Sequence, residues 1–371
     1  MTELLYYKDG YLKSTEATVT EIREGKVVFD KTIFYPECGG QPGDRGSFGD
    51  WKIIDTKKDK DGTPLHVIEG NLPEIGRKDE LSLDWEHRYF YMKEHTAQHL
   101  LSALMFHEYG IGTVAVHQGE EILTIETDRS EIDDDVLLSL EEKAMDEIIR
   151  SHKVYQVDMD RKEAESLKMR RSIKVDDESV KIVFISDLDA VACGGVHLSS
   201  TGEIKEICYR GKEQIRGRVR TIWSVGEKAR KYRRENERAV KECGKLLSSD
   251  SHSLSSTLEK FLAEDLELKK ECRELKQKVI ELELKERKEN PIVFESSVSI
   301  SEAPEIVEKY SKEKKVFILD GTNKRSFLFF GTKDDFEKIK KGCTLKGGGR
   351  EPLFRGTILD ADIEKIKEIL A

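Results

Sequence analysis

The sequence has few of the features that mark secreted, membrane or RNA-coating proteins. Only six of its 371 residues are cysteine; they are scattered and form no CxxC pair, which excludes a disulfide scaffold. The N-terminus has no apolar core of signal-peptide length, and no run approaches the ~20 apolar residues that cross a bilayer. These absences predict a soluble, cytoplasmic protein with no membrane partner.

The chain also lacks an overall positive charge, since its net charge is −10 although 37% of its residues are charged. Any contact with nucleic acid must then come from a local basic patch. One candidate is the stretch 210–234, which holds ten Lys or Arg and two acidic residues. A solvated helix face is the alternative for its later half. The expected RNA contacts are Arg210, Lys212, Arg216, Arg218 and Arg220.

Hydrophobic periodicity predicts an α+β fold in four segments. Residues 1–88 alternate like strands around the loop FYPECGGQPGDRG, which indicates a β-barrel-like domain. Residues 89–225 mix a long helical pattern with strands, and residues 226–290 are helical and highly charged. Residues 291–371 alternate strand and helix as a small α/β domain, whose three glycines before Arg350 are expected to form a turn that presents backbone N–H groups.

The helical segment carries an apolar seam typical of a coiled coil. Its spacing leaves two alternatives open, an antiparallel hairpin within one chain or a pairing between two chains. The second alternative predicts a homodimer through the C-terminal region. The seam consists of Leu254, Leu258, Phe261, Leu268, Leu275, Val279 and Leu282.

Two pairs of residues predict a metal site. His95 and His99 are four residues apart on an expected helix, so both imidazoles lie on one face. Cys193 and His197 flank two glycines that allow a sharp turn. Four such ligands suit one tetrahedral zinc ion per chain. The alternatives are an accidental surface pair of histidines and a structural cysteine beside an exposed histidine.

The histidine pair does not belong to a zinc protease. Those enzymes need HExxH, with a glutamate base directly after the first histidine. Here Thr96 occupies that position. A metalloprotease is therefore disfavoured.

Three motifs resemble the editing domain of alanyl-tRNA synthetase and its free-standing relatives, the AlaX proteins, in their long subtype. They are TIFYPECGGQPGDRG, DWEHRYFYMKEHTAQHLLSAL and CGGVHLSSTGEI, which together cover roughly residues 1–225. A weaker likeness joins KGGGREPLFRG to the end of the synthetase. Val196 and Cys38 depart from the family pattern; Val196 donates no ligand, whereas Cys38 lies near the expected pocket.

The resemblance implies a hydrolase that removes serine, and glycine as a further substrate, from tRNA(Ala), the tRNA for alanine, without ATP. His117 aligns with a polar pocket residue of the family, which implies that it reads the serine hydroxyl; an ordinary exposed histidine at a turn is the alternative. The glycine-rich loop Gly39, Gly40 and Gln41 could offer backbone N–H groups to the substrate, and a structural turn is the alternative. Arg350 would add a tRNA contact. The zinc ion could activate water, orient the ribose or hold the amino group; four protein ligands favour a positioning role.

Three other functions are alternatives to this one. A complete synthetase is disfavoured because only about 30 residues precede the FYP motif. A zinc hydrolase of small molecules does not explain the basic stretch or the long helical arm. The remaining alternative is a non-catalytic, zinc-containing tRNA-binding protein, which would release nothing from mischarged tRNA.

Overall fold

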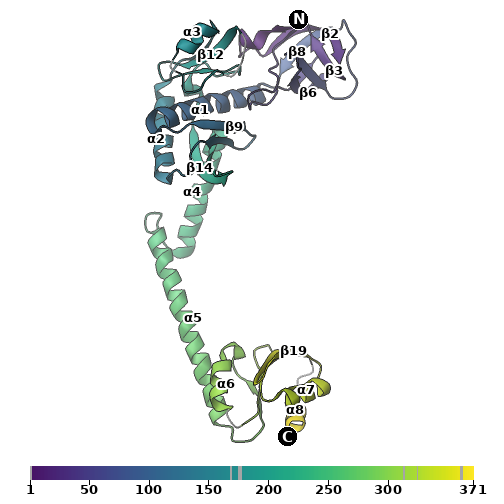
Figure 1. Ribbon diagram of the computed structural model, residues 1–371, viewed down its shortest axis with the longest axis vertical. Coiled ribbons are helices and arrows are strands. Elements are labelled where there is room, and N and C mark those ends of the chain that lie inside the picture. Colours follow the sequence, from purple (N-terminus) through teal and green to yellow (C-terminus); the bar gives the residue numbers. More distant parts are fainter. Residues whose placement is uncertain (1, 168, 174–177, 312–313, 324, 360–361) are drawn as a thin grey trace. The chain divides into compact units, whose positions relative to one another are not determined.

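The computed structural model describes residues 2–167, 169–173, 178–311, 314–323, 325–359 and 362–371. The chain forms two compact units, Met1–Val240 and Lys241–Ala371 (Figure 1). Strands and helices alternate along both units, so the predicted mixed α+β fold is confirmed. None of the helices in these ranges is long and apolar enough to cross a membrane.

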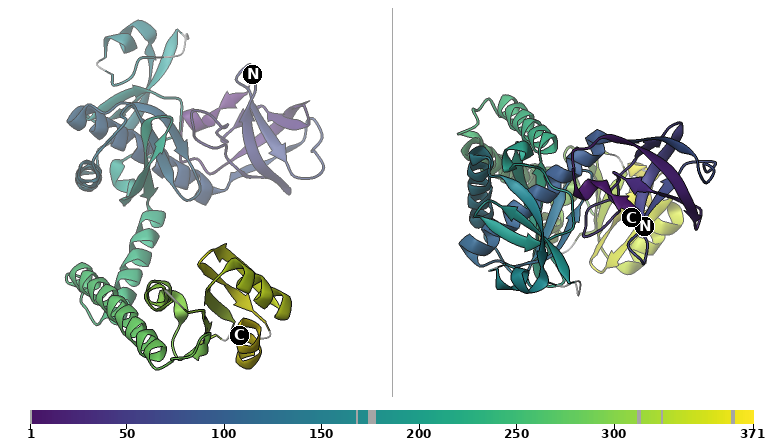
Figure 2. Two further views of the ribbon diagram at one scale, coloured as in Figure 1. Left: turned by 60° about the horizontal axis from the view of Figure 1, so that its bottom comes forward. Right: turned by 90° about the horizontal axis from the view of Figure 1, so that it is seen from above.

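The first unit begins with a closed six-stranded barrel, which confirms the predicted barrel-like domain (Figures 1 and 2). Before it, β1 (Glu3–Leu4) pairs with β4 (Lys31–Thr32), and a short 3-10 turn follows β1. Alternate side chains such as Phe29, Phe48 and Leu81 fill the interior, because successive residues of a strand point to opposite faces. In spatial order the barrel strands are β2 (Ser14–Arg23), β3 (Lys26–Phe29), β7 (Pro64–Ile68), β6 (Trp51–Lys58), β5 (Gly46–Phe48) and β8 (Lys78–Leu83).

A 25-residue helix, α1 (Trp85–Tyr109), follows the barrel directly. Asp84 caps its start by accepting a hydrogen bond from the backbone N–H of His87. Gly110 ends it in the left-handed conformation, at φ 63°. Its buried residues lie around much of its circumference, so α1 is the central element of the unit.

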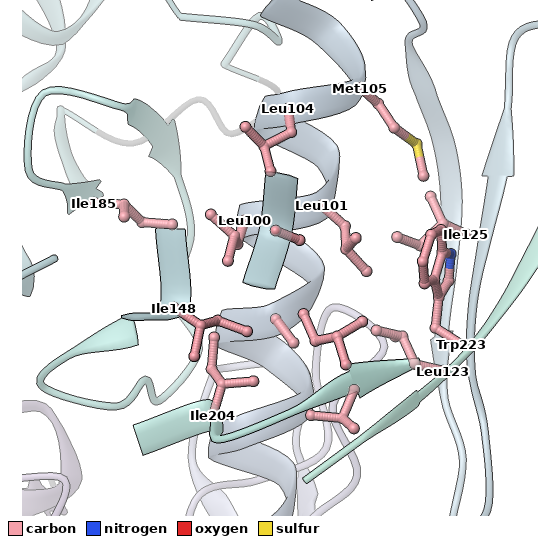
Figure 3. Close-up of a cluster of buried hydrophobic side chains, with 14 of the residues drawn as sticks. Leu100, Leu101, Leu104, Met105, Leu123, Ile125, Ile148, Ile185, Ile204 and Trp223 are labelled. Atoms are coloured by element: carbon pink, nitrogen blue, oxygen red, sulfur yellow. The ribbon is translucent and has the colours of Figure 1, made fainter. Parts of the chain in front are cut away.

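Two sheets enclose α1. One has the order β14 (Ile207–Ile215), β15 (Arg218–Val225), β10 (Leu123–Thr127) and β9 (Thr113–Gln118); the other has β11 (Val154–Asp160), β12 (Ser179–Ile185) and β13 (Asp189–Ala192). Two further helices, α2 (Asp134–Arg150) and α3 (Arg161–Ser166), complete this region. Figure 3 shows Leu101 and Met105 of α1 directed toward Ile125 and Trp223, and Leu100 on the side of Ile148 and Ile185. Each such buried side chain contributes about 1.5–3 kcal/mol.

A buried ion pair joins the barrel to α1. Arg88 is fully buried, and its Nε lies 2.9 and 3.0 Å from the two carboxylate oxygens of Asp44. The guanidinium also donates to the carbonyl oxygens of Gly10 and Ile33, at 2.9 and 2.6 Å. Asp44 in turn accepts the backbone N–H of Tyr35. These bonds fix the orientation of α1 relative to the loop that precedes β5.

Two helices, α4 (Glu227–Leu247) and α5 (Leu254–Lys285), occupy the segment with the apolar seam. Five seam side chains stay exposed on α5, with exposed fractions of 43–65%: Leu258, Phe261, Leu268, Leu275 and Leu282. The described residues of the second unit do not bury them. The last turns of α5 do pack, through Ile280 and Leu284.

The second unit contains a five-stranded sheet in the order β16 (Ile292–Ser296), β17 (Val316–Asp320), β18 (Ser326–Phe330), β20 (Leu353–Ile358) and β19 (Leu345–Arg350). The end of α5 and α6 (Pro304–Tyr310) cover one face, and α7 (Lys333–Gly342) and α8 (Ile363–Leu370) cover the other (Figure 2).

The expected glycine turn before Arg350 is wrong. Gly347 and Gly349 lie in β19, the edge strand of this sheet. A Cβ on Gly349 would lie 2.2 Å from the carbonyl oxygen of Leu353, so glycine here permits close strand pairing. Arg350 is the exposed last residue of that strand.

Candidate metal centre and substrate cleft

The structure brings together the four predicted ligands. His95 and His99 lie on adjacent turns of α1, and Cys193 and His197 follow the end of β13. One ligand atom from each residue lies within 4.8 Å of all the others. The Sγ atom of Cys193 is 3.4 Å from Nε2 of His95 and 3.5 Å from Nε2 of His197.

These distances suit one metal ion. Tetrahedral zinc, with Zn–S and Zn–N bonds of about 2.3 and 2.0–2.1 Å, places sulfur and nitrogen ligands about 3.5 Å apart. In addition, Nδ1 of His99 is buried and has no hydrogen-bond partner among the described residues. The donor set of three imidazoles and one thiol is one that zinc prefers.

Glycine at position 195 is required by the approach of the two ligand pairs. A Cβ there would lie 2.1 Å from Cε1 of His95. The backbone N–H of Gly195 points at Sγ of Cys193, at 3.4 Å. Thr96, at the position where a zinc protease has its glutamate, accepts the backbone N–H of Leu198 at 3.0 Å. It therefore anchors the chain next to His197 and is not a base.

Gln41 has a role that sequence reasoning missed. Its Oε1 lies 2.8 Å from Nδ1 of His95 and also accepts the backbone N–H of Val196, at 3.3 Å. This bond places the proton of His95 on Nδ1 and leaves Nε2 for a metal, as partners of ligating histidines do. The backbone N–H of Gln41 is used by the carbonyl of Cys38, at 3.0 Å. It is therefore not available to a substrate in this conformation.

Burial sets the protonation of the ligands. It lowers the pKa of His95 to about 3 and lowers the pKa values of His99 and His197 well below their ordinary value. All three imidazoles are then neutral at neutral pH, which is the form that binds metals. Burial also raises the pKa of the Cys193 thiol to about 11.

A cleft of about 1590 Å³ opens at this cluster. Residues of the barrel, α1, β9, β12 and β13 line it, among them His95, His99 and Cys193. Gly39 also lines it, and the backbone N–H groups of Gly39 and Gly40 make no hydrogen bond to other described residues. The predicted loop thus retains two free donors, of which the N–H of Gly39 belongs to a residue that lines the cleft.

The other predicted pocket residues are placed unevenly. Cys38 lines the cleft and is exposed. His117 is exposed on β9 and does not line the cleft, although Val116 beside it does. Gln98 precedes His99 on α1 and was not predicted from the sequence. Its side chain is buried and lines the cleft. Its Nε2 donates to Ser102, at 2.8 Å.

Most of the basic stretch 210–234 is neutralised within the protein. Lys212 pairs with Asp134, and Arg220 pairs with Glu213. Arg216, at the β14–β15 turn, has no ion pair with any described residue. The remaining contacts join Arg210 to the ring of Tyr232, Arg218 to Glu126, Lys228 to Glu121, Arg230 to Glu206, Lys231 to Glu235, and Arg233 to Glu141 and Glu206.

Known proteins share these features. Residues 180–220 match the threonyl and alanyl tRNA synthetase second additional domain. The chain is 37% identical to the alanyl-tRNA editing protein AlaX-L of Pyrococcus horikoshii over 214 residues, which are 55% of this chain and 53% of that protein. The chain is a homologue of the AlaX editing proteins. The resemblance predicted from its motifs is confirmed.

Alanine–tRNA ligases are also similar, and over a longer part of the chain. The ligase of Pyrococcus furiosus is 30% identical over all of this chain and 43% of its own length. That of Korarchaeum cryptofilum is 27% identical over all of this chain and 45% of its own length. The chain spans about half the length of the curated relatives it matches. The similarity to the ligases therefore includes the helical segment and the C-terminal sheet.

Proposed function

We propose that the protein hydrolyses the ester between a wrong amino acid, serine or glycine, and the tRNA for alanine. The observation that supports this most is the convergence of four candidate metal ligands, three of which line a large cleft, in a homologue of the editing proteins. Water is the second substrate, and no ATP is needed. One zinc ion per chain would be held by His95, His99, Cys193 and His197.

The chain's own groups supply most of the proposed mechanism. Zinc, when bound, would supply a positive charge that orients the terminal ribose or the substrate's amino group. Gly39 and Gly40 would direct backbone N–H groups at the ester carbonyl, where negative charge develops during hydrolysis. The four-ligand shell favours positioning over activation of water. Gln41 holds His95 in the tautomer that can bind the ion.

The test of this function is direct. Purified protein is incubated with seryl-, glycyl- and alanyl-tRNA, and loss of the ester is followed over time. We expect the seryl and glycyl esters to be lost and the alanyl ester to survive. A zinc-containing protein that only binds tRNA would leave all three esters intact.

Gln98 and His117 are the two candidates for the side chain that hydrogen-bonds the serine hydroxyl, and we propose Gln98. Comparing one variant of each residue separates them. We expect Gln98→Leu to lower the rate on seryl-tRNA about 5- to 150-fold, the loss of one hydrogen bond, with a smaller effect on glycyl-tRNA. Gln98 lines the cleft, whereas His117 is exposed outside it, so His117→Ala should change both rates little. A serine-selective loss in His117→Ala would reverse this assignment in favour of the residue implied by the family resemblance.

For binding of the tRNA body we propose the hairpin β14–β15, with Arg210 and Arg216 as cations that have no acidic partner among the described residues, and Arg350 in the second unit. The contribution of Lys212, Arg218 and Arg220 would be reduced by their acidic partners within the protein, because an already paired cation gains less from a phosphate.

We also propose a homodimer that covers the exposed apolar face of α5. This face has no partner among the described residues, since its seam side chains are exposed: Leu258, Phe261, Leu268, Leu275 and Leu282. Replacing Phe261 and Leu268 by glutamate should halve the mass measured by light scattering, since charge in an apolar seam prevents pairing. Glu259→Lys, a neighbouring charge change off the seam, is the control. An unchanged dimer mass in the double variant would rule out this interface.

A further inference from the structure

Two basic residues of the cleft, Lys58 and Arg171, have no ion pair with any described residue, and only Arg171 is partly buried. Its lining includes five basic residues: Arg23, Lys58, Arg170, Arg171 and Lys181. Three of them are neutralised, Arg23 by Glu21, Asp59 and Asp61, Arg170 by Asp189, and Lys181 by Asp158. Lys58 is exposed to solvent, where an isolated charge costs little. Arg171 is different because it is partly buried and has no ion pair with any described residue.

The surroundings of Arg171 disfavour an isolated charge. Burial, followed by the positive charge of Arg170, lowers the pKa of Arg171 below its ordinary value. Removing a guanidinium from water is costly unless an anion compensates it. Arg171 lines the same cleft as His95, His99 and Cys193. A cation with no ion pair among the described residues thus lines the cleft in which we propose that the ester is hydrolysed.

We propose that Arg171 binds the phosphodiester that joins the 3′-terminal nucleoside of a charged tRNA to the nucleotide before it. This inference rests on the proposed function, and it assigns a second subsite next to the ester. An amino acid attached to tRNA has lost its carboxylate to the ester bond, so the anions of the substrate are its phosphates. The first of these is one ribose away from the ester.

The chemistry of the side chain fits a phosphate. A guanidinium offers a planar fork of N–H donors that can bind two phosphate oxygens at once. Arg170, its neighbour in the sequence, cannot compete for the phosphate because both carboxylate oxygens of Asp189 lie 3.0–3.1 Å from its Nε in a buried pair. The pair also fixes the backbone beside Arg171. The structure thus supplies one anchored arginine and one that is free to bind a ligand.

Two minimal substrates test this subsite. The seryl ester of adenosine has no phosphate, and the seryl ester of cytidylyl-adenosine has one. We expect the wild-type protein to show a KM about 10- to 100-fold lower for the second ester, the range of a charge-assisted hydrogen bond or pair of bonds. Arg171→Gln should lose that preference and keep the wild-type rate on seryl adenosine. Arg171→Lys, which keeps the charge without the fork, should recover part of it.

Binding of the uncharged trinucleotide CCA gives a readout that needs no hydrolysis. Its affinity should fall with salt, and Arg171→Gln should reduce the log–log slope by about 0.7, the value for one phosphate of a single strand. Arg216→Gln is the matched control, since it removes an unpaired arginine outside the cleft. It should weaken binding of whole tRNA and leave the trinucleotide unaffected.

The outcomes separate the two proposals. Equal KM values for the two esters in the wild type, or an unchanged trinucleotide affinity in Arg171→Gln, would overturn the phosphate subsite. Equal slowing of both esters in Arg171→Gln would do the same, because it indicates a structural role. If the wild type hydrolyses no ester at all, the proposed function fails, and the trinucleotide experiment still decides the role of Arg171.

Discussion

Replacing Cys193 by alanine is expected to remove the metal ion and, with it, hydrolysis of seryl-tRNA. Cys193 is the one ligand that can carry a negative charge, and its Sγ lies 3.4–3.5 Å from two of the imidazoles. The affinity for zinc should fall by more than the roughly 10- to 100-fold that loss of a hydrogen-bonding neighbour of a ligand causes. The three remaining ligands would still have to be ordered around the ion with one bond fewer.

Elemental analysis after dialysis measures the metal, and a single-turnover assay measures the hydrolysis. Cys38→Ser is the matched control, because it removes a thiol from the same cleft that is not among the four ligands. It should keep a full equivalent of metal. A full equivalent in Cys193→Ala would show that the cluster is not the metal site, whereas loss of metal with unchanged hydrolysis would show that the ion has no part in the reaction.

The ligands could be predicted from the sequence because short-range geometry determines how each pair is presented. Four residues along a helix bring His95 and His99 to one face, and two glycines let Cys193 and His197 turn back on each other. The barrel could also be predicted from the sequence, since the alternation of apolar and polar residues in a strand is a local signal. What spacing alone does not show is that the two pairs meet.

The features that were missed depend on partners far away in the chain. Gln41 contacts His95 across 54 positions, and no local pattern marks that amide as a neighbour of a ligand. The basic stretch suggested a large cationic surface, but Glu126, Glu141 and Glu206 fold against it. Charge counted along a sequence does not reveal charge compensated in space. The glycines before Arg350 likewise form a strand because β20 lies beside them.

The ion pair between Arg88 and Asp44 explains why two of the family-like motifs occur together. Asp44 lies in the glycine-rich loop and Arg88 in the segment that leads to the first histidine. The pair is buried, with exposed side-chain fractions of 0% and 3%. Through it, α1 and the loop with Gly39 and Gly40 are held in one arrangement. The geometry of the cleft thus depends on the Arg88–Asp44 ion pair, although neither residue lines the cleft.

Arg88→Met should therefore destabilise the first unit by about 3–5 kcal/mol, the cost of leaving one buried partner uncompensated. The Asp44 carboxylate would keep the backbone N–H of Tyr35 but lose the guanidinium. Urea denaturation followed by tryptophan fluorescence measures the change. The double variant Arg88→Met with Asp44→Asn should be less unstable than the sum of its single variants, because no buried charge remains. Arg45→Met, which breaks a largely exposed pair with Asp84, should cost about 0–1 kcal/mol and is the control. If Arg88→Met were as stable as Arg45→Met, the buried pair would not hold the barrel to α1, and the two motifs would need another reason for their common occurrence.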